Sequence, residues 1–126
     1  MATCFEILDH HARVRGDKVA LTCAAGQVTY AALNETIGRF GTLLTAMGVR
    51  TGERVVLALP DGPDFFYAFF GAMKCGAWPV PLSPDLSCRE YAYVLQDCRA
   101  SALITVGGSQ AATEGRGTLK TLLVDD

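Results

Sequence analysis

The sequence predicts an α/β fold: a mainly parallel sheet with flanking helices, plus a small N-terminal antiparallel hairpin. Two observations carry this prediction. After residue 50, short apolar runs of strand length alternate with longer segments of helix length, which is the pattern of parallel strands joined by crossover helices. Before residue 50, two strand-like runs flank the short turn Ala24-Ala25-Gly26, and a turn this short joins antiparallel strands.

A helix is expected first, followed by the hairpin. Thr3 and Glu6 have the spacing of a capping box, in which each side chain satisfies a free N–H group at a helix start. The helix should run from there to about Arg15. The hairpin strands should cover Val19–Cys23 and residues 27–29, which are rich in β-branched and apolar side chains.

The second helix should begin after Thr29, whose hydroxyl can cap the first N–H groups. Apolar residues then recur at three- and four-residue steps, which places them on one face of a helix. That stripe consists of Tyr30, Leu33, Ile37, Phe40, Leu43, Leu44 and Met47. Gly48 follows it, at the position where a left-handed residue usually ends a helix.

Four apolar runs should form the parallel sheet: residues 55–59, 77–82, 102–106 and 121–124. The first is apolar throughout, as in a strand covered on both faces. Pro79 and Pro81 mark the second as an edge strand, because proline cannot donate to a sheet ladder. Between these two strands, the helix over residues 63–75 leaves almost no polar face and should be largely buried. A second capping box, Ser87 with Glu90, should start the last helix.

Composition excludes several function classes. Half of the 126 residues are hydrophobic, 19% are charged and the net charge is −2, which fits a globular domain. Nucleic-acid binding is not expected without clustered Lys and Arg. No apolar run reaches the ~20 residues of a membrane span, and no signal peptide is visible. The five cysteines have no close spacing, so reduced thiols in a cytoplasmic protein are expected.

Two segments that could carry chemistry have simpler structural explanations. Residues 107–120 follow a strand and are rich in Gly, Ser and Thr, but they lack the spacing of a phosphate-binding loop. A surface loop is the favoured interpretation. His10 and His11 are neighbours on the first helix, so their side chains point about 100° apart and cannot grip one metal ion together.

The acidic and aromatic candidates also have structural explanations. Asp61, Asp64 and Asp85 border strand and helix ends, where active sites often lie, but an acid near a helix start is also favoured by the helix dipole. An aromatic cluster could line a pocket, although core packing is favoured. It consists of Phe65, Phe66, Tyr67, Phe69 and Phe70. We therefore predict no catalytic, cofactor-binding or metal-binding residue in the 126 residues.

Four stretches carry a family resemblance. They are Gly16-Asp17-Lys18-Val19-Ala20-Leu21, Val28-Thr29-Tyr30-Ala31-Ala32-Leu33, Gly48-Val49-Arg50-Thr51-Gly52-Glu53-Arg54-Val55, and Phe69-Phe70-Gly71-Ala72-Met73-Lys74-Cys75-Gly76-Ala77 with Pro79-Val80-Pro81-Leu82. In this order they resemble the opening of the large domain of the adenylate-forming acyl- and aryl-CoA ligases. Residues 85–95, with Ser101 and Ala102, are most similar to benzoate-CoA ligases.

The resemblance implies that residues 1–126 are the N-terminal part of an AMP-binding large domain without an internal boundary. The parent enzyme would join a benzoate-like acid to ATP as an acyl-adenylate and then transfer the acyl group to coenzyme A, with Mg²⁺. The family's reaction motifs would lie beyond Asp126, so this segment would bind no cofactor and would be inactive alone. Its expected partners are the remainder of the ligase chain and, through exposed apolar surface, other copies of itself.

Two other functions remain open from the sequence. The chain could be a stand-alone interaction module without catalytic activity. It could also be a small flavodoxin-like domain that binds a ligand, although no phosphate-cradling loop supports that interpretation.

Overall fold

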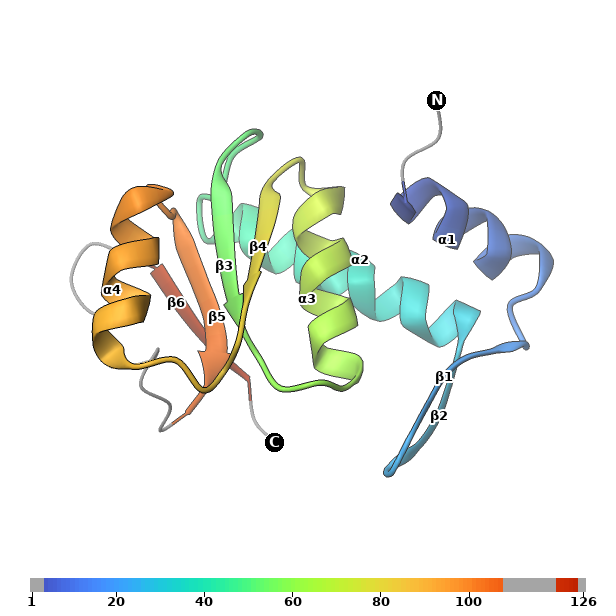
Figure 1. Ribbon diagram of the computed structural model, residues 1–126. Coiled ribbons are helices and arrows are strands. Elements are labelled where there is room, and N and C mark those ends of the chain that lie inside the picture. The colour runs from blue at the N-terminus through green and yellow to red at the C-terminus, as the bar shows by residue number, and fades with distance from the viewer. Residues whose placement is uncertain (1–3, 108–119, 125–126) are drawn as a thin grey trace.

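The computed structural model describes residues 4–107 and 120–124. Its elements are α1 (Cys4–Val14), β1 (Val19–Cys23), β2 (Gly26–Thr29), α2 (Tyr30–Ala46), β3 (Arg54–Ala58), α3 (Pro63–Lys74), β4 (Trp78–Leu82), α4 (Cys88–Asp97), β5 (Ala102–Val106) and β6 (Lys120–Val124). Figure 1 shows α4 on one side of the larger sheet, with α2 and α3 on the other. The predicted α/β class is confirmed.

The larger sheet has four parallel strands in the order β4-β3-β5-β6. Its centre is β3, where Val56 pairs with Val80 of β4 and with Leu103 of β5. Residues 55–58 of β3 and 102–105 of β5 are completely buried, as expected for strands covered on both faces. The predicted edge strand β4 does lie at an edge.

Alternation along the strands divides the core into two clusters. Val55, Leu57 and Ile104 point to the side of α2 and α3, together with Leu44 and Ala68 from those helices. The second cluster lies under α4 and consists of Val56, Ala58, Leu103 and Tyr91, with Val80 and Leu82 packed against it. The sheet is therefore the middle of three layers, and each helical layer has its own apolar contact with it.

The two helices of one layer cross at glycines. Gly41 of α2 and Gly71 of α3 are buried, and a Cβ atom placed on Gly41 would lie 3.2 Å from the carbonyl oxygen of Gly71. A Cβ atom on Gly71 would lie 2.6 Å from Cβ of Phe40, closer than real atoms of this kind approach. Small residues at the crossing thus allow the two backbones to approach closely.

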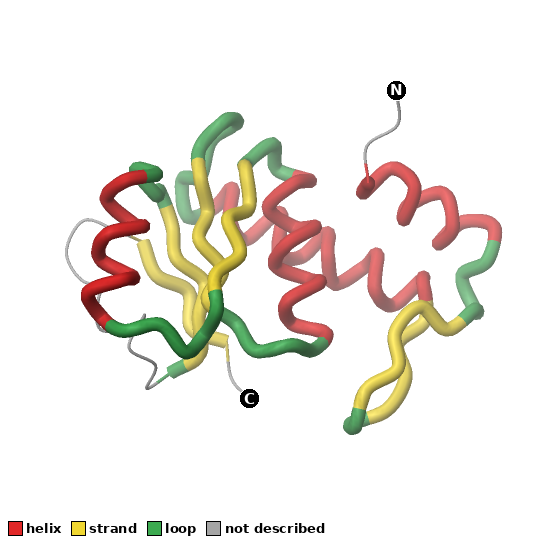
Figure 2. Tube along the Cα trace, in the orientation of Figure 1, coloured by secondary structure: helices red, strands yellow, loops and turns green. Residues whose placement is uncertain are grey.

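The hairpin of β1 and β2 forms a separate antiparallel sheet, as predicted. Figure 2 shows it projecting from the N-terminal end of α2, away from the four-stranded sheet. Thr29 joins the two elements, because its hydroxyl accepts a hydrogen bond of 3.2 Å from the N–H of Ala32 and caps α2. The predicted cap of the first helix at Thr3 lies outside the described residues.

The burial of α3 differs from the prediction. Its buried residues are Ala68, Gly71 and Ala72, whereas Phe66 is 38% exposed. The other aromatic residues of α3 are half-buried. The reason is geometric: the close crossing with α2 and the contact with the sheet select the small side chains, so the large rings are displaced to the flank of the helix. No described helix is long and apolar enough to cross a membrane.

Candidate functional site

The carboxyl edge of the four-stranded sheet is the place where a ligand of an open α/β sheet usually binds. The chain steps from β3 to β4 on one side and then returns past β3 to β5, so the strand order reverses between β3 and β5. Crevices at such reversal points hold ligands in many α/β folds. The described connections at this edge are residues 59–62 and 83–87, together with the first residue after β5, Gly107.

The charged residues in these described connections are acidic. Asp61 is exposed in the connection between β3 and α3, Asp64 lies in the first turn of α3, and Asp85 is exposed after β4. Neither residues 59–62 nor residues 83–87 contain a lysine or arginine. A nucleotide polyphosphate is bound by cationic side chains or by N–H donors, and these two connections supply no cationic side chain.

The described part of the chain also does not fit a metal ion. Among residues 4–107 and 120–124, no three His, Cys, Asp or Glu side chains gather as metal ligands would. His10 and His11 lie beside each other on α1 with ring centroids 5.6 Å apart, and the ring of His11 packs against Tyr30 at 5.4 Å. His11 therefore packs against α2, whereas His10 is exposed. Most of the Gly-rich segment 107–120 lies outside the described residues.

The connection after β4 is held by a buried tyrosine of α4. The hydroxyl of Tyr91 donates to the carbonyl oxygen of Ser83 at 2.5 Å and accepts from the N–H of Leu86 at 3.3 Å. Burial raises the pKa of Tyr91. The predicted capping box is also present, because Ser87 and Glu90 exchange hydrogen bonds of 3.1 and 3.2 Å. The path of the chain at this edge is thus fixed by these four hydrogen bonds within residues 83–91.

Removing the tyrosine hydroxyl is expected to loosen this connection. Tyr91→Phe keeps the ring but leaves the carbonyl of Ser83 and the N–H of Leu86 without their partner, so we expect a loss of about 1–2 kcal/mol in the free energy of unfolding. Urea denaturation would measure it. Tyr93→Phe is the matched control, because Tyr93 lies on the same helix and is 69% exposed. Equal midpoints for the two variants would contradict a bracing role for Tyr91.

The Glu53-Arg54 pair organises the opposite, amino edge of the sheet. The guanidinium of Arg54 donates from Nε to the carbonyl oxygen of Cys98 at 2.7 Å, at the end of α4. The carboxylate of Glu53 accepts from the hydroxyl of Ser101 at 2.7 Å and from the N–H of Arg50 at 2.6 Å. These bonds, that from Ser101 first, lower the pKa of Glu53. The sequence points to Glu53 and Arg54 only through the family resemblance. Their contacts hold neighbouring connections of the chain together.

The aromatic side of α3 borders a groove. Phe69 and Met73 of α3, Phe5 of α1, and Trp78 and Pro79 of β4 line a hollow of about 410 Å³. The predicted core packing holds for Phe65 and Phe69, which contact the core cluster, and the ring of Tyr67 packs against Phe40 of α2 at 6.1 Å. Phe66 is the exposed ring of the cluster. The lining contains no titratable side chain, so the groove is suited to packing and offers no group for acid–base chemistry.

Comparison with known proteins places this arrangement in a family. Residues 8–125 match the family model described as AMP-binding enzyme. The crotonobetaine/carnitine–CoA ligase of Salmonella paratyphi A is 40% identical over 105 residues, which cover 79% of this chain and 20% of the relative. This chain thus spans about a fifth of the length of the curated relatives it matches.

Solved structures of CoA ligases contain the same fold. The benzoate-CoA ligase of Burkholderia xenovorans LB400 has 28% sequence identity and a TM-score of 0.87, and the match covers 100% of this chain and 26% of the ligase. The anthranilate CoA ligase AuaEII, solved with anthranoyl-AMP, has 29% identity and a TM-score of 0.88 over 98% of this chain and 25% of that one. The whole described arrangement, hairpin included, is thus similar to part of a much longer ligase.

Proposed function

Because the chain belongs to the family of AMP-binding enzymes, we propose that it is the N-terminal part of the large domain of an ATP-dependent acid–thiol ligase. The match of residues 8–125 confirms the family named from the sequence motifs. The observation that carries the proposal is the similarity, over the full length of this chain, to a benzoate-CoA ligase structure. The proposed reaction forms an acyl-adenylate and then a CoA thioester.

The role proposed for this segment is to support the fold of the large domain, without contributing residues to the reaction. The side chain of Tyr91 at one edge of the sheet and that of Arg54 at the other each donate a hydrogen bond to a backbone carbonyl oxygen. These contacts stabilise the path of the chain. The described connections at the carboxyl edge carry aspartates and no cation. We therefore infer that ATP, Mg²⁺ and coenzyme A are bound by residues of the parent enzyme outside this segment.

An aromatic, benzoate-like acid is the proposed substrate of the parent enzyme. Support comes from two solved neighbours that are named for benzoate and anthranilate. A second candidate is a small betaine-like acid, which is favoured by the 40% identity to crotonobetaine/carnitine–CoA ligase. The two acids differ in charge and shape, so one enzyme is not expected to prefer both.

The substrate class can be tested on a full-length ligase that contains this segment. Acid-dependent exchange of pyrophosphate into ATP would be measured with benzoate, anthranilate, carnitine and crotonobetaine. We expect kcat/KM to be highest for the aromatic acids, by at least about tenfold, which corresponds to 1.4 kcal/mol of differential transition-state binding. A preference for carnitine or crotonobetaine would replace the aromatic proposal, and no exchange with any acid would contradict the ligase function.

A further inference from the structure

An apolar surface that no described element covers runs along the outer side of α3. We call it the aromatic flank and define it by Phe5, Phe66, Phe69, Phe70, Met73 and Trp78. Trp78 is 67% exposed and Phe66 is 38% exposed. The rings of Phe66 and Phe70 stack with centroids 6.4 Å apart, and Phe69 meets Phe70 edge to face at 5.3 Å. The rings thus form one continuous surface.

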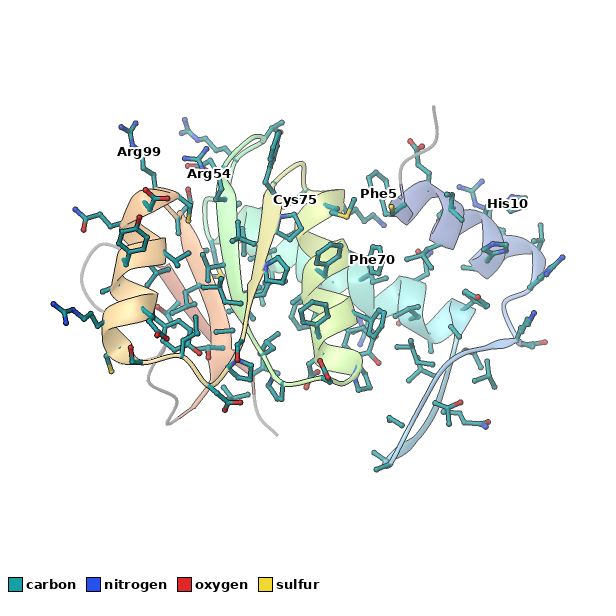
Figure 3. All side chains as sticks on the ribbon, viewed as in Figure 1. Phe5, His10, Arg54, Phe70, Cys75 and Arg99 are labelled. Carbon is teal, nitrogen blue, oxygen red and sulfur yellow. The ribbon has the colours of Figure 1, made fainter. Side chains whose placement is uncertain are left out.

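Four residues of the aromatic flank, Phe5, Phe69, Met73 and Trp78, line the groove between α1, α3 and β4. Figure 3 shows Phe5 on α1 and Phe70 on α3 on the side of the molecule that faces the viewer, where neither α2 nor α4 covers them. The groove of about 410 Å³ places Phe5 next to Phe69 and Trp78. An exposed apolar patch that is continuous across three elements is typical of an interaction surface, whereas single exposed apolar residues are not.

The neighbouring edge of the sheet cannot accept another strand by regular pairing. The N–H of Trp78 donates to the carbonyl oxygen of Glu53 at 2.7 Å, so it points toward β3. Backbone groups alternate along a strand, and the positions that face outward are therefore those of Pro79 and Pro81. Proline has no N–H group. A partner on this side must bind through side-chain packing and not by extending the sheet.

The length of the relatives indicates what covers the aromatic flank. The same fold is present in the benzoate-CoA ligase, with this chain matching only 26% of it, so most of that longer polypeptide lies outside the matched part and is available to cover it. We propose that the aromatic flank is the surface on which the rest of an adenylate-forming ligase chain docks, through apolar side chains. This inference rests on the proposed function and adds the location and chemistry of the contact.

Hydroxyl-radical footprinting can test the docking without any measurement of activity. The isolated chain would be compared with a chimera in which it replaces the matched segment of the Salmonella paratyphi A ligase, taken as the monodisperse fraction. We expect the oxidation rates of Trp78, Met73 and Phe70 to fall at least about fivefold in the chimera. Tyr93, which is 69% exposed on α4, is the internal control and should keep its rate. Unchanged rates at the aromatic flank would overturn the proposal.

A matched pair of substitutions gives a second test. Trp78→Gln and Tyr93→Gln change side chains of nearly equal exposure, so both should leave the melting temperature of the isolated chain unchanged. In the chimera, Trp78→Gln should lower the melting temperature by several degrees and Tyr93→Gln should not. Equal behaviour of the two variants in the chimera would contradict the docking surface.

The oligomeric state of the isolated chain distinguishes two possible occupants of the aromatic flank: the rest of a ligase chain, as proposed, and a second copy of this chain. Self-association through exposed apolar surface is the other expectation from the sequence. If the rest of a ligase chain is the occupant instead, light scattering should give the mass of a monomer, and the oxidation rate of Trp78 should not depend on protein concentration. A dimer with Trp78 protected at high concentration would assign the aromatic flank to self-association and overturn the proposed occupant. Protection of the flank in a chimera that lacks ligase activity would keep the docking surface and count against the proposed function alone.

Discussion

Gly71→Ala is expected to destabilise the fold by about 1–3 kcal/mol, because the crossing of α2 and α3 is closely packed and has no room for the added methyl group. Its Cβ would lie 2.6 Å from Cβ of Phe40 and 3.2 Å from the backbone nitrogen of Gly41. Neither atom is the flexible end of a side chain, so relief requires α2 and α3 to separate. That separation would also disturb the contact of Leu44 and Ala68 with the sheet.

Gly38→Ala is the matched control in the facing helix. Its Cβ would meet only Nζ of Lys74 at 3.6 Å, which is an ordinary contact with a mobile group. Alanine is the better helix former, so this variant should gain about 0.5–1 kcal/mol. Chemical denaturation of both variants would measure the difference. A Gly71→Ala variant that is as stable as Gly38→Ala would show that the two helices do not cross at these glycines.

Much of the fold could be predicted from the sequence because its signals are local. The cap at Thr29, the capping box of Ser87 and Glu90, and the hairpin each depend on residues within a few positions of one another. Pro79 and Pro81 indicated an edge strand, since proline removes the donors that a central strand needs. These features place every described strand within one or two residues of its predicted bounds.

The burial of α3 could not be predicted from its own sequence. A helix that is apolar on all sides gives no periodic signal for the side that faces the core. That choice is made by contact with α2, at Gly41 and Gly71, and with β3 and β4. The consequence for Phe69 is direct: it is half-buried and not enclosed, so its removal should cost less than the loss of a fully buried aromatic ring.

The candidate site shows the same limit more strongly. The hydrogen bonds of Tyr91 with Ser83 and Leu86 depend on how α4 lies against the connection after β4, which no local pattern in the sequence indicates. The prediction that no catalytic, cofactor or metal residue lies in the 126 residues stays a prediction. It concerns residues 108–119 as well, which lie outside the described part of the chain.

The largest effect is expected on activity. The isolated chain should not adenylate any acid, whereas a full-length ligase that contains it should. Stabilising the charge that develops on a transferring phosphate requires donors and a metal ion aimed at it. The described connections at the carboxyl edge contribute Asp61 and Asp85 without a lysine or arginine, and such carboxylates repel a polyphosphate. Typical enzymes accelerate their reactions by more than about 10⁶-fold over the uncatalysed rate. Without that acceleration, the exchange rate of the isolated chain should not exceed background.

The most direct measurement is acid-dependent pyrophosphate–ATP exchange with the isolated 126-residue chain beside a full-length ligase that carries the same segment. Both would be assayed with benzoate, anthranilate, carnitine and crotonobetaine, and circular dichroism would establish that the isolated chain is folded. If the chain is a scaffold segment of an adenylate-forming ligase, we expect background exchange by the folded isolated chain and clear exchange by the full-length protein. Acid-dependent exchange by the isolated chain would contradict the scaffold role.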